Sequence, residues 1–272
     1  MLTRAITGTL FVVAITTAIY YGVYSSALLF ILIVLLGVDE FYDMVKKNKH
    51  IEPLRIWGTI TGLTFICTLL AIISKGITVR YILIPIMMVF FTFILELYRK
   101  KQTPFLNIGY TIIGICYIVI PFSMLYHLGY YNDSSSEQGF SYQIILGFFF
   151  LLWTNDTGAY LAGKYLGKHK LFERISPKKT WEGSIGGAIL TLAVAYVLSI
   201  YFTNLSINNW LVTGILITVF GGLGDLVESM LKRSIGIKDS GNILPGHGGI
   251  LDRFDGLLLA APFVYCYLQL IQ

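Results

Sequence analysis

The sequence predicts an all-α fold, a polytopic helix bundle that spans a membrane with its N-terminus in the cytoplasm. Of the 272 residues, 56% are hydrophobic and only 13% are charged, and the mean hydropathy is +0.72. A soluble domain carries about 25% charged residues, because water must solvate its surface. The apolar residues form long runs without the two-residue alternation of a membrane barrel. We therefore expect helices, whose backbone groups pair internally in lipid.

Nine apolar runs each approach the roughly 20 residues that a helix needs to cross the hydrocarbon of a bilayer. In order along the chain they cover residues 5–22, 25–45, 57–74, 78–98, 105–126, 142–163, 184–203, 209–231 and 254–271. Basic segments at 46–55, 99–101, 164–179 and 232–253 and a polar segment at 131–138 separate many of them. The sequence thus predicts about nine transmembrane helices.

The basic residues set the orientation of these helices. All but Lys75 and Arg80 of the 20 Lys and Arg residues fall, in the nine-helix topology, on the side that holds Arg4. Loops rich in Lys and Arg stay in the cytoplasm, so we expect a cytoplasmic N-terminus. The same topology explains the net charge of +5, which therefore does not indicate a nucleic-acid partner.

The cysteines and histidines give no sign of a disulfide or zinc site. Cys67, Cys116 and Cys266 all lie in apolar runs without a CxxC spacing, and we expect them to be buried packing residues. The four histidines include no HExxH or similar ligand pair, which argues against zinc.

Small and charged residues end the eighth run, which reads Gly221-Gly-Leu-Gly-Asp225-Leu-Val-Glu228-Ser229-Met-Leu-Lys232-Arg233. On a helix, the side chains at 225, 228, 229 and 232 share one face. Gly221 lies on that face one turn earlier and would let another helix or a ligand approach. Carboxylates at a membrane boundary need a partner, such as a cation or a water-filled cavity. The alternative is a helix-end salt-bridge patch with Lys232.

A Gly-rich segment precedes the last run and reads Lys238-Asp239-Ser-Gly-Asn-Ile-Leu-Pro245-Gly246-His247-Gly248-Gly249-Ile-Leu-Asp252-Arg253-Phe-Asp255. Pro and several glycines so close together exclude a helix interior. Such a loop, bordered by Lys and Arg, leaves backbone N–H groups free to face phosphate oxygens. Asp252 and Asp255 begin the last helix and can hold a hard cation. The alternative is a tight re-entrant turn with a capping aspartate.

Two further segments carry polar residues beside apolar runs. Asp156 lies deep in the sixth run and shares a face with Tyr160; an intramembrane Asp is a functional candidate, although a Thr or Tyr hydrogen bond could also satisfy it. The segment Ser176-Pro177-Lys178-Lys179-Thr180-Trp-Glu-Gly183 leads into the seventh run. Pro at a helix start with adjacent lysines and a Thr suits a phosphate cradle, and ordinary cytoplasmic positive charge is the alternative.

These residue types together are typical of phosphoryl or nucleotidyl transfer. Carboxylates hold Mg²⁺, the metal neutralises and orients phosphates, and Lys and Arg stabilise the charge on the leaving group. A substrate that brings its own phosphate oxygen needs no covalent nucleophile on the protein.

The stretch from Ser229 to Asp255 resembles, position by position, the signature of the phosphatidate cytidylyltransferases, or CDP-diacylglycerol synthases. The matching positions are Ser229, Lys232, Arg233, Lys238, Asp239, Gly241, Pro245, His247, Gly248, Gly249, Asp252, Arg253 and Asp255. The segments at 224–229, 176–183 and 156–160 are also similar to this family, and no motif position departs from it. Residues 1–140 match only in hydropathy.

The resemblance implies a specific reaction, in which phosphatidic acid attacks CTP and gives CDP-diacylglycerol and pyrophosphate at the cytoplasmic face of the cell inner membrane. It implies metal binding, with Mg²⁺ and room for a second cation, by Asp225, Asp252, Asp255, Asp156 and Glu228. It implies catalytic roles for Asp225, Asp252, Lys232, Arg233 and His247. It implies substrate binding by Lys178, Lys179, Ser176, Thr180, Ser229, Lys238, Gly248, Gly249 and Arg253.

The implied partners are CTP, phosphatidic acid and the bilayer, with no nucleic acid. We expect residues 1–140 to form a packing bundle, compatible with a homodimer, and residues 141–272 to form the catalytic half. A CDP-alcohol phosphotransferase would need a D-G-x-x-A-R run, and a polyprenyl-phosphate sugar-phosphate transferase would need a paired Asp-Asp; the chain has neither. A transporter would not need a Lys-rich and Gly-rich loop, and a purely structural membrane protein would explain the hydropathy alone.

Overall fold

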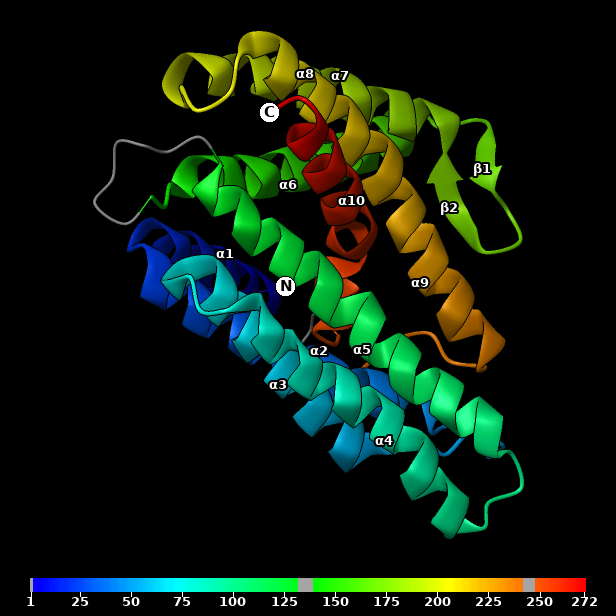
Figure 1. Ribbon diagram of the computed structural model, residues 1–272. Coiled ribbons are helices and arrows are strands. Elements are labelled where there is room, and N and C mark those ends of the chain that lie inside the picture. The colour runs from blue at the N-terminus through cyan, green and yellow to red at the C-terminus, as the bar shows by residue number, and fades with distance from the viewer. Residues whose placement is uncertain (1, 132–138, 242–247) are drawn as a thin grey trace. The chain divides into compact units, whose positions relative to one another are not determined.

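The computed structural model describes residues 2–131, 139–241 and 248–272, and helices dominate them (Figure 1). In chain order the elements are α1 (Leu2–Tyr20), α2 (Val23–Val45), α3 (Arg55–Lys75), η1 (Val79–Ile82), α4 (Leu83–Arg99), α5 (Pro104–His127), η2 (Leu128–Tyr130), α6 (Tyr142–Leu166), β1 (Lys170–Phe172), β2 (Ser176–Thr180), α7 (Trp181–Tyr201), α8 (Ile207–Leu216), η3 (Ile217–Gly221), α9 (Gly222–Ser234) and α10 (Leu251–Leu270).

Local sequence explains where several helices begin and end. Ser141, Thr180 and Ser206 each precede a helix, and each hydroxyl oxygen accepts a backbone N–H from the first turn of that helix. Pro104 begins α5, a position where its missing N–H breaks no hydrogen bond. Helix α3 ends at Gly76, whose φ of 59° favours glycine.

Every apolar run predicted from the sequence coincides with a helical run in the described part of the chain. Six of these are long and apolar enough to cross a membrane, at 55–75, 79–99, 104–130, 142–166, 181–201 and 207–234, and a shorter apolar helix covers residues 6–20. The prediction of a helical, multi-pass membrane protein is therefore confirmed. The count of nine spans and the cytoplasmic N-terminus stay predictions.

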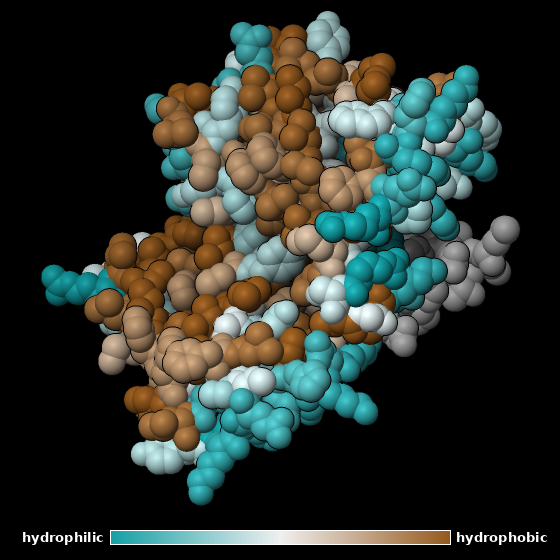
Figure 2. Space-filling view, turned by 90° about the vertical axis from the view of Figure 1, so that its right-hand side faces the viewer, coloured by the Kyte–Doolittle hydropathy of each residue, from teal (hydrophilic) through white to brown (hydrophobic). Residues whose placement is uncertain are grey.

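The surface of these helices suits lipid. Large hydrophobic side chains are exposed on α4, α5 and α7, among them Leu97 and Phe105. Figure 2 shows brown, hydrophobic side chains over much of the visible surface, bordered by teal, hydrophilic ones. The expected burial of Cys67, Cys116 and Cys266 is wrong, because each lies exposed on its helix.

The chain divides into two compact units. Unit 1 comprises Met1–His127 with Ser234–Arg253 and contains α1 to α5. Its core includes Tyr42, whose hydroxyl donates to the carbonyl oxygen of Thr111 at 2.6 Å. A Cβ built at Gly58 or Gly114 would lie within 2.7 Å of the Tyr42 side chain, so glycine at these positions lets α3 and α5 close around the ring.

Unit 2 comprises Leu128–Arg233 with Phe254–Gln272. Small residues let α6 and α7 approach at backbone distance: a Cβ at Gly158 would lie 3.0 Å from the Cα of Gly187. A Cβ at Gly186 would lie 2.2 Å from the Cβ of Ala162. Close contact between small residues is a common basis of helix packing in membranes. The functional division at residue 140 stays a prediction.

A two-stranded hairpin corrects one expectation. Pro177 was expected at the start of a helix, but it lies in β2, which pairs antiparallel with β1, and α7 begins only at Trp181 after the N-cap Thr180. In a two-stranded sheet each strand is an edge, where a proline without an N–H is tolerated.

Candidate active site

The predicted charged face of α9 is present in unit 2. The Ser229 hydroxyl donates to Asp225 Oδ1 at 3.2 Å, and Lys232 Nζ lies 3.1 Å from Glu228 Oε1. Glu228 and Lys232 are both buried. The predicted sharing of one helix face is confirmed, and the salt bridge to Lys232, which was the structural alternative, is present as well. The π-helix η3 directly precedes α9, and such segments often occur at functional sites.

Lys179 joins the hairpin to this face. Its Nζ lies 2.7 Å from Asp225 Oδ2 and donates to the carbonyl oxygen of Gly222 at 3.0 Å. The neighbouring Thr180 is buried and caps α7 by accepting the N–H of Gly183 at 3.2 Å. This cap fixes the end of β2 at the start of α7, and with it the backbone position of Lys179.

A cavity of about 400 Å³ lies beside this ion pair. It is lined by Asn155, Asp156, Ala159, Tyr160, Gly163, Lys164, Leu171, Lys178, Lys179, Thr180, Gly183, Ser184, Thr218, Gly222 and Asp225. Asp156 is exposed on α6, so it faces the cavity rather than the packed interior. The structure thus brings together predicted residues from the sixth run, the hairpin and α9.

Two carboxylates that line the cavity, Asp156 and Asp225, interact electrostatically with a third, Asp255. The negative charges of Asp225, Glu228 and Asp156 all act on Asp255. Glycine allows this approach, because a Cβ at Gly224 would lie 2.5 Å from the carbonyl oxygen of Asp255. Like charges this close need protons or cations to offset them.

The donor set suits Mg²⁺, although the carboxylates do not form a closed cage. In the described parts of the chain, no three His, Cys, Asp or Glu side chains are close enough to hold one ion together. Mg²⁺ usually keeps several waters and takes one or two carboxylates plus substrate phosphates, so a closed cage is not required. The predicted metal ligands stay a prediction.

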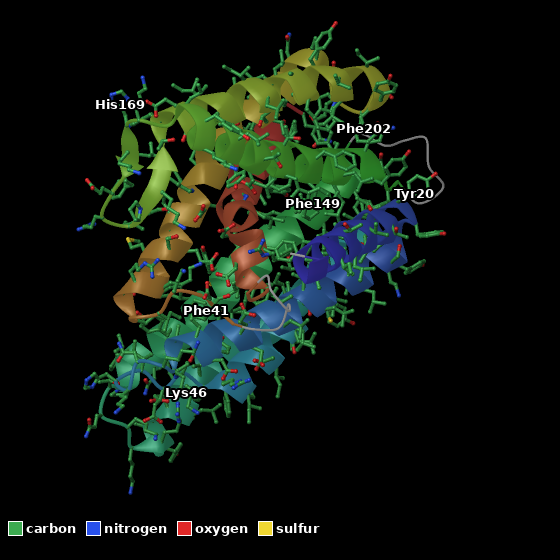
Figure 3. All side chains as sticks on the ribbon, turned by 180° about the vertical axis from the view of Figure 1, so that it is seen from behind. Tyr20, Phe41, Lys46, Phe149, His169 and Phe202 are labelled. Carbon is green, nitrogen blue, oxygen red and sulfur yellow. The ribbon has the colours of Figure 1, made fainter. Side chains whose placement is uncertain are left out.

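The hairpin is anchored at its base by hydrogen bonds that the sequence did not indicate. Glu182, in the first turn of α7, accepts the backbone N–H groups of Lys168 and His169. Its Oε1 also lies 2.6 Å from His169 Nδ1. Figure 3 shows His169 on the hairpin. This contact joins the start of β1 to the first turn of α7, next to the end of β2, the strand that carries Lys178 and Lys179.

The Gly-rich segment belongs to unit 1. Asp252 Oδ2 accepts the backbone N–H groups of Ser240 at 3.1 Å and Gly249 at 2.9 Å. Gly248 has a φ of +84°, which favours glycine. Asp252 thus caps the loop, and its predicted role as a metal ligand is not tested by these contacts. Lys238 is exposed at the start of the segment.

Most of the remaining predicted residues lie at the surface. Lys178, Arg233 and Arg253 are exposed, and Ser176 is half-buried on β2. His247 lies outside the described residues. The assignment of roles to all of these side chains stays a prediction.

Sequence reasoning missed three residues that the structure places at these sites. Asn155 and Thr218 line the cavity, and the buried Thr218 hydroxyl has no hydrogen-bond partner among the described residues. Glu40, buried on α2, contacts the Gly-rich segment. Its signal was present in the sequence, because an acidic residue inside an apolar run is a functional candidate by default.

Comparisons with known proteins agree with the resemblance in the motifs. A phosphatidate cytidylyltransferase of Staphylococcus epidermidis is 38% identical over 234 residues, which cover 85% of each chain. Phosphatidate cytidylyltransferases of Staphylococcus aureus (strain COL) and Staphylococcus saprophyticus are 43% and 44% identical over 167 residues. That match spans 61% of this chain and about 60% of the length of those two relatives. The model of the cytidylyltransferase family matches residues 2–271, and the chain belongs to this family.

Proposed function

We propose that the chain transfers the cytidylyl group of CTP to phosphatidic acid and so makes CDP-diacylglycerol for phospholipid synthesis. A phosphate oxygen of phosphatidic acid forms a bond to the α-phosphorus of CTP. The bond from that phosphorus to the bridging oxygen of the β-phosphate breaks, and pyrophosphate leaves with the electron pair. The observation that carries the proposal is the Lys179–Asp225 pair at 2.7 Å, set beside a 400 Å³ cavity in a member of this family.

The residues of the cavity suit the charges of such a reaction. Lys178 and Lys179 approach from β2 and Lys164 from α6, so three cationic side chains line the space that phosphates would occupy. A phosphate oxygen can replace Asp225 as the partner of Lys179, because ammonium groups bind both anions. The lysine would then stabilise negative charge as it develops on the departing pyrophosphate.

Magnesium is part of this proposal. When bound, Mg²⁺ would neutralise phosphate charge and lower the barrier to attack on phosphorus. Asp225 and Asp255 are the proposed ligands, with Asp156, Glu228 and Asp252 in support. The proposed catalytic and substrate-binding groups beyond the cavity are Lys232, Arg233, His247, Ser176, Ser229, Lys238, Gly248, Gly249 and Arg253.

The cellular setting is proposed on the basis of charge. With nine spans and the basic segments in the cytoplasm, the motifs at 156–183 and 225–255 would face the compartment that contains CTP. The protein would then be a multi-pass protein of the cell inner membrane with its active site on the cytoplasmic side. A homodimer through residues 1–140 is compatible with the exposed apolar surface of those helices.

A lipid-labelling assay tests the proposal. The purified chain, reconstituted in lipid nanodiscs with phosphatidic acid and Mg²⁺, is given CTP labelled at the α-phosphate, and labelled lipid is expected. CTP labelled at the γ-phosphate should label only pyrophosphate. Label in the lipid from the γ-position would indicate phosphate transfer instead, and no labelled lipid from either nucleotide in any lipid or detergent would refute the proposal.

Two controls make the assay specific. Diacylglycerol in place of phosphatidic acid should give no labelled lipid, because it lacks the attacking phosphate oxygen. A chelator should stop the reaction and added Mg²⁺ should restore it. Full activity in excess chelator would remove the divalent cation from the proposal.

A further inference from the structure

Helix α2 places a buried carboxylate against the Gly-rich segment, within unit 1. Glu40 is only 4% exposed. Its Oε1 accepts the Ser240 hydroxyl at 2.5 Å and the backbone N–H of Leu251 at 3.0 Å, and its Oε2 accepts the N–H of Ile250 at 2.8 Å. Figure 3 labels Phe41, the next residue on this helix. One carboxylate therefore binds both ends of the segment from 240 to 251.

Two glycines of the segment owe their identity to this contact. A Cβ built at Gly249 would lie 2.0 Å from Glu40 Oε1, and one built at Gly241 would lie 2.8 Å from Glu40 Oε2. No side chain fits at either position while the carboxylate stays where it is. Both positions therefore require glycine because the Glu40 carboxylate lies so close to them.

Asp252 completes the attachment from the other side. Its Oδ2 accepts the N–H groups of Ser240 and Gly249, while Glu40 accepts the Ser240 hydroxyl. Ser240 is 2% exposed and is held through both its backbone and its side chain. The two carboxylates use four backbone or hydroxyl donors from the loop and one from the start of α10. This fixes the distance between the loop ends and the direction in which α10 begins.

We propose that Glu40 is a positioning residue of the active site, which holds Ser240, Gly249, Ile250 and the start of α10 in the arrangement that binds substrate phosphate. This inference rests on the proposed function, in which Gly248, Gly249 and Asp252 act on the substrates. A hydrophobic side chain would suffice to pack α2, and it would avoid the desolvation of a charge in an apolar helix. A carboxylate that accepts three directed hydrogen bonds instead sets the orientation of the segment it binds.

Substitutions at Glu40 differ in how many of the three hydrogen bonds they keep. Glu40→Ala removes both acceptor oxygens and so all three hydrogen bonds, and its kcat/KM for CTP is expected to fall about 100-fold, since a misplacement of about 1 Å has that effect. Glu40→Gln keeps one oxygen but turns an N–H group toward that of Ile250, and about a 10-fold fall is expected. Glu40→Asp keeps the charge on a shorter stem and should retain more activity than the Gln variant.

A matched control separates positioning from general stability. Glu96 is also a buried carboxylate of unit 1, and it binds Arg99 and Asn107 at 2.7 Å each, away from the Gly-rich segment. Glu96→Gln should lower thermal stability to a similar degree as Glu40→Gln. It should leave kcat/KM per folded molecule within about twofold of the original chain, since no loop donor is lost.

Amide hydrogen exchange supplies a readout that does not depend on turnover. Exchange at residues 248–251 should speed up in the Glu40 variants and stay unchanged in Glu96→Gln. Ser240→Ala should raise exchange there less than Glu40→Ala, and adding it to Glu40→Ala should have no further effect on kcat/KM, because the same hydrogen bond is removed in both.

The possible outcomes separate this inference from the proposed function. If the unaltered chain makes no labelled lipid, the proposed function fails first. The positioning role is overturned if the original chain makes labelled lipid while Glu40→Ala and Ser240→Ala keep full kcat/KM per folded molecule. It is also overturned if Glu96→Gln, which loses similar stability, loses as much kcat/KM per folded molecule as Glu40→Gln. Loss of kcat/KM together with faster exchange confined to 248–251 supports it.

Discussion

The contact between α6 and α7 should determine both the stability and the activity of unit 2, and Gly187 is the position at which to test it. An ideal Cβ on Gly187 would lie 2.8 Å from Asn155 Oδ1 and 2.9 Å from the Asn155 carbonyl oxygen, whereas ordinary contact begins at 3.4 Å. Gly187→Ala must therefore move the two helices apart by about 0.5 Å, from 2.9 to 3.4 Å at the carbonyl oxygen.

Two opposing effects set the change in the free energy of unfolding of Gly187→Ala. Overpacking costs about 1–3 kcal/mol, and the higher helix propensity of alanine returns about 1 kcal/mol. We expect a net loss of up to about 2 kcal/mol in the free energy of unfolding. Because a displacement of 1 Å can lower turnover about 100-fold, half that displacement between Asp156 and Lys179 is expected to lower it about 10-fold.

Gly109→Ala is the matched control, because a Cβ at Gly109 in α5 meets nothing within 4 Å. That variant should be as stable as the original chain or more stable by up to about 1 kcal/mol. Thermal unfolding in one detergent and lipid labelling per folded molecule provide the two measurements. If Gly187→Ala and Gly109→Ala behave alike in both, the close packing of α6 on α7 does not position the site and the reasoning is refuted.

Three further predictions concern the site, the topology and a loop. Asp225→Asn should abolish lipid labelling while the protein still inserts, because an amide replaces the charge that pairs with Lys179 and suits Mg²⁺; a normal rate would overturn the assignment. A reporter fused after Gln272 should be active only outside the cytoplasm, and cytoplasmic activity contradicts nine spans. The hydrogen bond from Lys101 holds the pKa of Glu52 below its ordinary value of 4.5. The pair therefore stabilises the loop fully above pH 4.5. This stabilisation is lost as the pH falls through the lowered pKa. Between about pH 6 and pH 3, the thermal midpoint should fall more in the original chain than in Glu52→Gln, and parallel curves would argue against the pairing.

The helices could be predicted because lipid leaves the backbone little choice. Every apolar run became helical, since N–H and C=O groups in hydrocarbon must pair within their own segment. Whether a given helix crosses the membrane also depends on how many charged residues it carries. Helix α2 carries Asp39, Glu40 and Asp43, and α10 starts with Asp252 and Asp255, so neither is as clearly apolar as the other runs.

The hairpin could not be predicted by the same reasoning. Its strands have three and five residues, which is too short for an alternating pattern to stand out from a polar loop. Pro177 beside the apolar seventh run favoured a helix start, and only the pairing with β1 shows that its missing N–H is tolerated on an edge.

Contacts within one helix were predictable, and contacts between elements were not. Asp225 with Ser229, and Glu228 with Lys232, follow from a spacing of four residues on α9. The pairing of Lys179 with Asp225 depends on how α6, α7 and the hairpin pack, and no local pattern encodes it. The sequence identified both residues as candidates but did not indicate that they bind each other.

The three acids of α2 show how far periodicity alone could have gone. Asp39 and Asp43 are four residues apart and share a helix face, and both pair with Arg55. Glu40 lies about 100° from Asp39 but only three residues before Asp43, so helical spacing alone would allow it to join that cluster. Its partners lie 200 to 211 residues away in the chain, at Ser240, Ile250 and Leu251. Helical spacing therefore does not tell the buried acid from the two acids that pair with Arg55, and the fold is required to identify the donors to Glu40 as residues of the Gly-rich segment and the start of α10.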